Sequence, residues 1–134
     1  MVSQLTSMTD RLEASYRYCR WLTRRTAGNF GYAFWALPRK ERRAMDALYA
    51  FMRLTDDIGD EPGVSREHRV VQLWQWKIDL ASALRGEMPQ HLVWPALVDV
   101  MSTFTIPAEL LNDVIAGVEM DLSPREFATF AELS

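Results

Sequence analysis

Apolar residues recur every three or four positions along most of this 134-residue chain, and no stretch alternates apolar and polar residues as a half-buried strand does. Proline and glycine divide the pattern into segments of helical length. We therefore predict an all-α fold of about five to six helices. The expected helices are residues 9–25 with Thr9 as N-cap, 39–61 after Pro38, 66–85 between a Ser65 N-cap and Gly86, 90–104, 107–122, and a last one starting near Thr129.

Size and charge narrow the class of protein. With 49% apolar and 25% charged residues, the chain is long enough for one globular domain with a buried core. Its net charge of −3 and pI of about 5.4 argue against nucleic-acid binding, which is typical of basic proteins. Basic residues do cluster, at 24–25 and at 39–43, and the simplest interpretation of each run is a solvated helix face.

Cys19 is the only cysteine, so the chain forms no internal disulfide, and a reducing compartment is favoured. The two histidines, His68 and His91, lie far along the chain, so we expect Cys19 to be a buried small residue and not a catalytic thiol. The first residues lack the pattern of a signal peptide, and no run approaches the roughly 18 apolar residues of a membrane span. These features predict a cytoplasmic protein.

The most informative segment is residues 39–61, RKERRAMDALYAFMRLTDDIGDE. A helix advances about 100° per residue, which places one narrow polar stripe on its surface. The opposite side carries apolar residues and predicts a packing face. The stripe consists of Tyr49, Arg53, Asp56 and Asp60, and the packing face of Ala44, Ala47, Phe51 and Ile58.

Four acids crowd the end of this predicted helix, which is the negative end of its dipole. Each acid there costs about 0.3–1 kcal/mol, and like charges four residues apart add to the cost. A bound cation would relieve it, and two carboxylates one turn apart suit Mg²⁺, which keeps other positions for water and phosphate oxygens. Asp56 and Asp60 are therefore the candidate metal ligands. The alternative interpretation is an acidic helix end that simply faces water.

Residues 29–61 closely resemble the first conserved block of squalene and phytoene synthases. The block combines a Ser- or Asn-Phe start, Leu-Pro with basic residues, Leu-Tyr-Ala-Phe, an Arg, and Asp-Asp-x-x-Asp. Two later stretches, LWQWKIDLASALRGEMPQ and IPAELLNDVIAGVEMDL, resemble the family's Trp-containing helix and its Gly-x-x-x-Asp-Leu helix. The resemblance implies the N-terminal part of an isoprenoid synthase helical fold. It also implies a transferase that condenses two allylic diphosphates head to head through a cyclopropylcarbinyl diphosphate.

The resemblance also implies roles for individual residues. Asp56 and Asp60 would bind Mg²⁺, and Tyr49 and Arg53 would face the diphosphate as catalytic residues, with Arg53 as a charge-assisted donor. Three further residues are implied in substrate binding. They are Asn29, where the family often has a phosphate-contacting Ser, and Phe30 and Phe34, whose rings either shelter a carbocation or belong to the plain core.

Family members are about twice as long as this chain, and their second aspartate motif would follow after Ser134. We therefore expect residues 1–134 to be a partial domain, inactive alone, whose apolar lining is covered by the missing half or by a partner. Two rivals stay open: a truncated relative that serves as an interaction or assembly module, and a plain helical domain. The substrate would be farnesyl or geranylgeranyl diphosphate, with a leaning toward the former. NADPH is implied only if the product is squalene. Because the products are apolar, peripheral membrane contact stays open.

Overall fold

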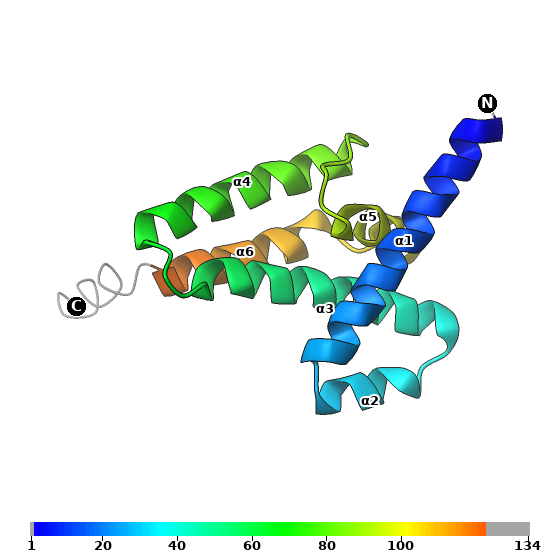
Figure 1. The fold of residues 1–134 in the computed structure, drawn as a ribbon, viewed down its shortest axis with the longest axis horizontal. Helices are drawn as coiled ribbons and strands as arrows, with labels where there is room; N and C mark the ends of the chain where they lie inside the picture. The colour runs from blue at the N-terminus through cyan, green and yellow to red at the C-terminus, as the bar shows by residue number, and fades with distance from the viewer. Residues whose placement is uncertain (1, 123–134) are drawn as a thin grey trace.

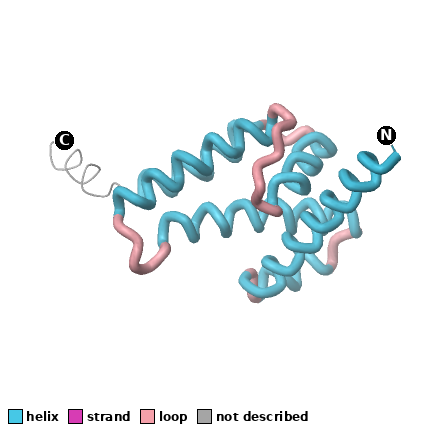
Figure 2. The backbone as a smooth tube through the Cα atoms, turned by 45° about the horizontal axis from the view of Figure 1, so that its top comes forward, coloured by secondary structure: helices cyan, strands magenta, loops and turns pink. Residues whose placement is uncertain are grey.

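The computed structural model describes residues 2–122, and at residues 2–6, 30 and 31 it describes the backbone only. Within this part of the chain every regular element is a helix, which confirms the predicted all-α class (Figures 1 and 2). The expected helix near Thr129 lies outside the described residues. The six described helices are α1 (Val2–Thr26), α2 (Asn29–Trp35), α3 (Arg39–Asp60), α4 (Arg66–Leu84), α5 (Val93–Phe104) and α6 (Ala108–Leu122).

Helix α3 is central to the arrangement. In Figure 1, α4 and α6 run alongside α3, while α1 crosses it at a steep angle and α5 packs behind the crossing. The shared core is aromatic at its centre: the rings of Phe51 and Trp76 stack with centroids 5.9 Å apart, and Trp94 lies 4.6 Å from Trp76. Such ring pairs add about 0.5–1.5 kcal/mol each beyond their buried area. The core thereby fixes α3 against α4 and α5.

Local sequence explains most helix boundaries. The Ser65 hydroxyl accepts a hydrogen bond from the backbone N–H of His68 at 3.2 Å, which confirms the predicted cap of α4. Gly86 has φ +91°, the left-handed conformation expected just past the end of that helix. Pro38 stands as the N-cap of α3, and Glu61 leaves the helix in an extended conformation just before Pro62.

Two expectations near the N-terminus were wrong. The first helix begins at Val2, so Thr9 lies inside it and is not its N-cap. Nothing in the preceding residues breaks a helix, and one good N-cap residue does not start one where the helical pattern continues upstream. The short apolar segment after Gly28 is itself a helix, α2, in which Tyr32 is 78% and Trp35 59% exposed.

The division of α3 into two faces is as predicted. Ala44, Ala47 and Phe51 are buried, and Ile58 is partly buried against the same core. On α1, Cys19 is also fully buried, and burial raises the pKa of its thiol to about 12, which agrees with a structural role. Among the described helices, none is long and apolar enough to cross a membrane.

Candidate metal-binding site

The last two turns of α3 carry the acidic cluster on the surface of the molecule. Asp56, Asp57, Asp60 and Glu61 are all exposed. Arg53, one turn earlier, is exposed as well, so the predicted stripe points outward and is not sealed in the core. These carboxylates are therefore accessible to an ion or an anionic ligand from solution.

Asp56 is the acid most affected by its neighbours. Partial burial raises the pKa of its carboxyl group, and the negative charges of Asp60, Asp57 and Asp121 raise it further, while Arg53 opposes them. A raised carboxyl pKa means that the charged form is disfavoured in the fold without a counterion. Metal ligands are used in their charged form, so a cation here would reverse this penalty.

Arg53 forms an ion pair with Asp57, with its Nε 3.2 Å from Oδ1. Both side chains are about half exposed, and such a surface pair contributes about 0–1 kcal/mol to stability. The pair is weak enough to exchange partners, so Arg53 can turn its guanidinium to an incoming anion at little cost. The arginine of the predicted polar stripe therefore pairs with Asp57, which lies outside the stripe, and not with Asp56 or Asp60.

Tyr49 connects the stripe to the N-terminal helices. Its hydroxyl lies 2.9 Å from Thr26 Oγ1 at the end of α1, and its ring meets Phe34 of α2 edge to face with centroids 6.4 Å apart. Asn29, the first residue of α2, is exposed, while the side chain of Phe30 lies outside the described residues. The structure therefore brings Tyr49 and Phe34 into contact, whereas Asn29 lines a separate surface pocket with Arg24, Tyr32 and Trp35.

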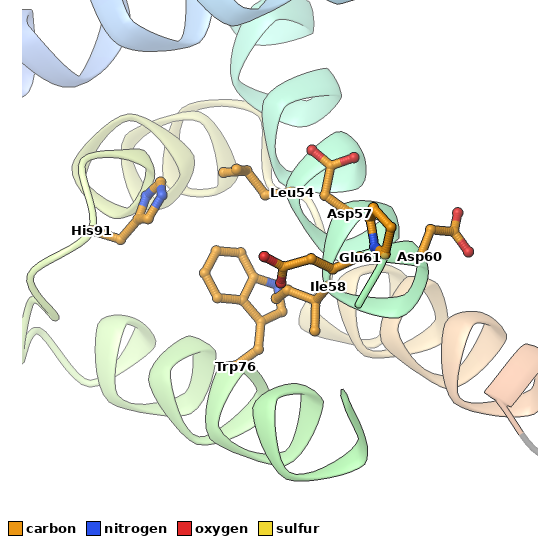
Figure 3. A pocket seen from close by; sticks show the side chains of 8 residues that line it. Leu54, Asp57, Ile58, Asp60, Glu61, Trp76 and His91 are labelled. Atoms are coloured by element: carbon orange, nitrogen blue, oxygen red, sulfur yellow. The ribbon is translucent and has the colours of Figure 1, made fainter. Parts of the chain in front are cut away.

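A pocket of about 380 Å³ opens beside the acidic end of α3, between α3, α4 and the segment before α5. Its aromatic wall is Trp76, whose Nε1 donates to Thr55 at 2.9 Å, next to His91, whose Nδ1 accepts from the N–H of Val93. Burial lowers the pKa of His91, which favours the neutral ring that this acceptor role requires. Asp57, Asp60 and Glu61 of the acidic cluster belong to the lining of this pocket. Figure 3 shows that the carboxylate of Asp60 points away from Trp76 at its edge.

The donors suit a metal ion that is shared with a ligand. Within the described part of the chain, no group of three or more His, Cys, Asp or Glu side chains forms a ready metal cage. Mg²⁺ does not need one, since it is commonly held by one or two carboxylates together with water and substrate phosphates. Asp56 and Asp60, one turn apart, exposed and electrostatically coupled, fit that mode of binding.

A family model described as squalene/phytoene synthase matches residues 23–134. The chain belongs to the squalene/phytoene synthase family. The match begins at the end of α1 and covers α2 to α6, so it includes every residue of the polar stripe.

Individual squalene/phytoene synthase relatives agree with this assignment. The chain is 35% identical to a phytoene synthase of Arthrospira platensis over 90% of its own length and 38% of the relative. It is 39% identical to a presqualene diphosphate synthase of Rhodopseudomonas palustris over 69% of its length and 33% of the relative. The crystal structure of squalene synthase HpnC from Alicyclobacillus acidocaldarius superposes with a TM-score of 0.74 at 29% identity, covering 84% of this chain and 41% of that one. The chain thus spans about a third to two fifths of these relatives.

Asp121 is the site residue that sequence reasoning missed. It lies on α6, 61 positions beyond Asp60, and its charge raises the pKa of Asp56. The signal was present in the Gly-x-x-x-Asp-Leu stretch that resembles the squalene/phytoene synthase family, but only the packing of α6 on α3 brings that acid near the stripe. The acidic surface is therefore built from two helices.

We predict that Asp121→Asn lowers the pKa of Asp56 toward the ordinary carboxyl value, because it removes one of the negative charges that hold it up. The titration of the Asp56 side-chain carboxyl carbon by NMR measures this. The same substitution at Asp113, also on α6 but not among the charges that act on Asp56, is the control. An unchanged Asp56 titration in the Asp121 variant would contradict the described geometry.

Proposed function

We propose that this chain supplies one side of the active site of a head-to-head prenyltransferase, in which Asp56 and Asp60 hold Mg²⁺ against the diphosphate of an allylic substrate. The observation that supports this most is the exposed polar stripe of α3, where two coupled carboxylates stand next to an arginine with an exchangeable partner. Bound there, Mg²⁺ would neutralise the charge that develops on a departing diphosphate.

The chain's own residues have distinct tasks in this proposal. Arg53 leaves Asp57 and donates charge-assisted hydrogen bonds to a phosphate oxygen. Tyr49 presents its hydroxyl, held by Thr26, toward the same ligand, and Phe34 fixes the orientation of that ring. Asn29 and Phe30 at the start of α2 complete the substrate-binding set, with Asn29 as a polar contact to phosphate. The aromatic residues exclude water from the hydrocarbon part of the substrate.

The proposed substrates are farnesyl or geranylgeranyl diphosphate, and NADPH is required only if the product is squalene. Because the curated relatives are much longer than this chain, we propose that residues 1–134 are a partial domain and do not catalyse the reaction alone. The rest of the site would come from the remaining length of such a protein or from a partner that covers the apolar face. We propose that the enzyme is cytoplasmic and contacts the membrane surface peripherally, where its apolar products would be released.

The test is a product assay with the complete protein, Mg²⁺, and either farnesyl or geranylgeranyl diphosphate. We expect a hydrocarbon or cyclopropyl diphosphate product with twice the carbon number from one of the two substrates, and none after EDTA treatment. The same assay on residues 1–134 alone should give no product. A complete protein that binds both substrates with Mg²⁺ but only hydrolyses them would rule out the condensation.

One observation favours a second candidate, a non-catalytic interaction module. The outer face of α4 exposes apolar side chains at helical spacing, with Val71 62%, Trp74 68% and Ile78 44% exposed. A helix that is apolar on both faces is usually covered. This candidate predicts that the complete protein gives no product in the assay above. It also predicts that replacing Asp56 and Asp60 leaves partner binding intact. The product assay therefore distinguishes the interaction module from the prenyltransferase.

A further inference from the structure

Basic residues of α1 meet the basic run at 39–43 in space. They surround a small pocket of about 120 Å³, at the place where α1 crosses the N-terminal half of α3 (Figure 1). The pocket is lined by five arginines and two acids together with one tyrosine. The lining residues are Glu13, Tyr16, Arg17 and Arg20 of α1 and Arg39, Arg42, Arg43 and Asp46 of α3.

Only part of this positive charge is compensated. Arg43 is engaged, since its Nη2 lies 3.0 Å from Glu13 Oε1 and its guanidinium lies 3.8 Å from the centre of the Tyr16 ring. By contrast, no salt bridge or hydrogen bond in the described part of the chain engages the guanidinium of Arg17, Arg20 or Arg42. The pocket therefore contains guanidinium groups whose hydrogen-bond donors are available to a ligand.

Asp46 is too buried to satisfy these arginines fully. It is 5% exposed, burial raises the pKa of its carboxyl group, and Arg20, Arg42 and Arg24 oppose that rise from around it. Five guanidinium groups thus face two carboxylates, in a chain whose overall net charge is −3. Crowding like charges at the surface is unfavourable without a counterion, and the first turn of α3, which has no side-chain cap at Pro38, adds the positive end of a helix dipole.

We propose that this pocket binds a phosphate or diphosphate group without a metal ion, between Arg20 of α1 and Arg42 of α3. Guanidinium groups from two helices can grip such a group with paired, charge-assisted hydrogen bonds. The volume selects the ligand: pockets for whole small organic molecules measure about 300–1,000 Å³, so 120 Å³ admits the inorganic group and leaves a hydrocarbon tail outside.

This anion site is separate from the aspartate stripe. Arg42 precedes Asp56 by 14 positions on α3, which at about 1.5 Å per residue separates them by about 21 Å along the axis. A shallower basic pocket of Arg24, Arg25 and Trp21 continues from it along α1. The bound group could belong to free pyrophosphate, which a condensation releases, or to the headgroup of an anionic lipid, since both present the same phosphate oxygens.

The experiment titrates the full chain with pyrophosphate by calorimetry, in EDTA and at constant ionic strength. We expect saturable binding that weakens at least tenfold in Arg20→Gln/Arg42→Gln. The matched control is Arg66→Gln/Arg85→Gln, at the first residue and the C-cap of α4, which removes the same charge and should bind normally. Asp56→Asn/Asp60→Asn should also bind pyrophosphate normally. The anion site can therefore be disproved without affecting the proposed function, and the proposed function can be disproved without affecting the anion site.

A second arm distinguishes the sources of the phosphate group. Vesicles of phosphatidylcholine with phosphatidylglycerol are floated with the wild type and both arginine variants. If only vesicles are bound, and only by proteins that keep Arg20 and Arg42, the site takes a lipid headgroup; if pyrophosphate binds, it takes the free anion. Circular dichroism checks that the variant is folded. The proposal is overturned if neither pyrophosphate nor the vesicles bind, or if the control variant loses as much binding as Arg20→Gln/Arg42→Gln.

Discussion

Replacing Asp56 and Asp60 together with Asn is expected to lower the Mg²⁺-dependent affinity of the complete protein for a prenyl diphosphate by at least about 100-fold. Hydrogen bonds and ligand contacts to charged groups contribute about 1.5–3 kcal/mol each, and two are removed, so a loss of about 3–6 kcal/mol, or two to four orders of magnitude, follows. Asn keeps the size of the side chain while removing its charge, so helix α3 should be undisturbed. Calorimetry with a non-hydrolysable prenyl diphosphate analogue, with and without Mg²⁺, measures the effect.

The matched control removes two acids from α6 instead. Glu109→Gln/Asp113→Asn carries the same change in net charge at exposed positions, so it should leave the Mg²⁺-dependent affinity within about twofold. If the α3 and α6 variants lose affinity equally, the effect is one of overall charge and the metal role is wrong. If neither loses affinity, the acidic end of α3 simply faces water.

Replacing Asp56 alone with Asn should stabilise the fold even though it lowers the Mg²⁺-dependent affinity. The pKa of Asp56 is raised in the fold, so the folded chain binds this proton more tightly than the unfolded chain does. Stability therefore falls as the pH rises from the ordinary carboxyl value of 3.8 through the raised pKa, and the cost is fully present at neutral pH. Asp56→Asn should raise the melting temperature in EDTA at pH 7 while it weakens metal-dependent binding, which a purely structural carboxylate would not do.

Helical spacing sufficed to predict the fold class and the two faces of α3. Both depend on local rules: the period of apolar residues, Pro and Gly as boundaries, and Ser65 as a cap. The prediction at Thr9 failed because an N-cap residue inside a continuing helical pattern does not begin a helix. The short segment at 29–35 gave too few residues for a period to show, although it folds as α2.

What the sequence could not show depends on contacts between distant helices. The stripe of Tyr49, Arg53, Asp56 and Asp60 follows from α3 alone, but its partners do not: Thr26 and Asp121 reach it from α1 and α6. The basic run at 39–43 was interpreted as a solvated face, whereas the crossing of α1 and α3 places it around one pocket with Arg17 and Arg20 of α1. The metal and catalytic roles of the stripe stay predictions until they are measured.

Gly59 connects the acidic motif to this packing. It is buried on α3 between Asp56 and Asp60, and a Cβ built there would lie 2.5 Å from Cγ1 of Val118 on α6. Valine has a stiff side chain in a helix, so it cannot turn away cheaply. The absence of a side chain at Gly59 is therefore what lets α6 approach α3 and bring Asp121 toward Asp56.

We predict that Gly59→Ala destabilises the fold by about 1–3 kcal/mol, as overpacking does, even though alanine is favoured over glycine within a helix by about 0.5–1 kcal/mol. Urea unfolding followed by circular dichroism measures the change. Gly117→Ala on α6 is the control: apart from the backbone of its own helix and its chain neighbours, nothing lies within 4 Å of a Cβ built there, so it should stabilise by about 0.5–1 kcal/mol. In a Val118→Ala background, where the clashing methyl is gone, Gly59→Ala should also turn neutral or stabilising. If Gly59→Ala destabilises the fold equally in both backgrounds, Gly59 is not required for the close approach of α6 to α3. The proximity of Asp121 to Asp56 would then need another cause.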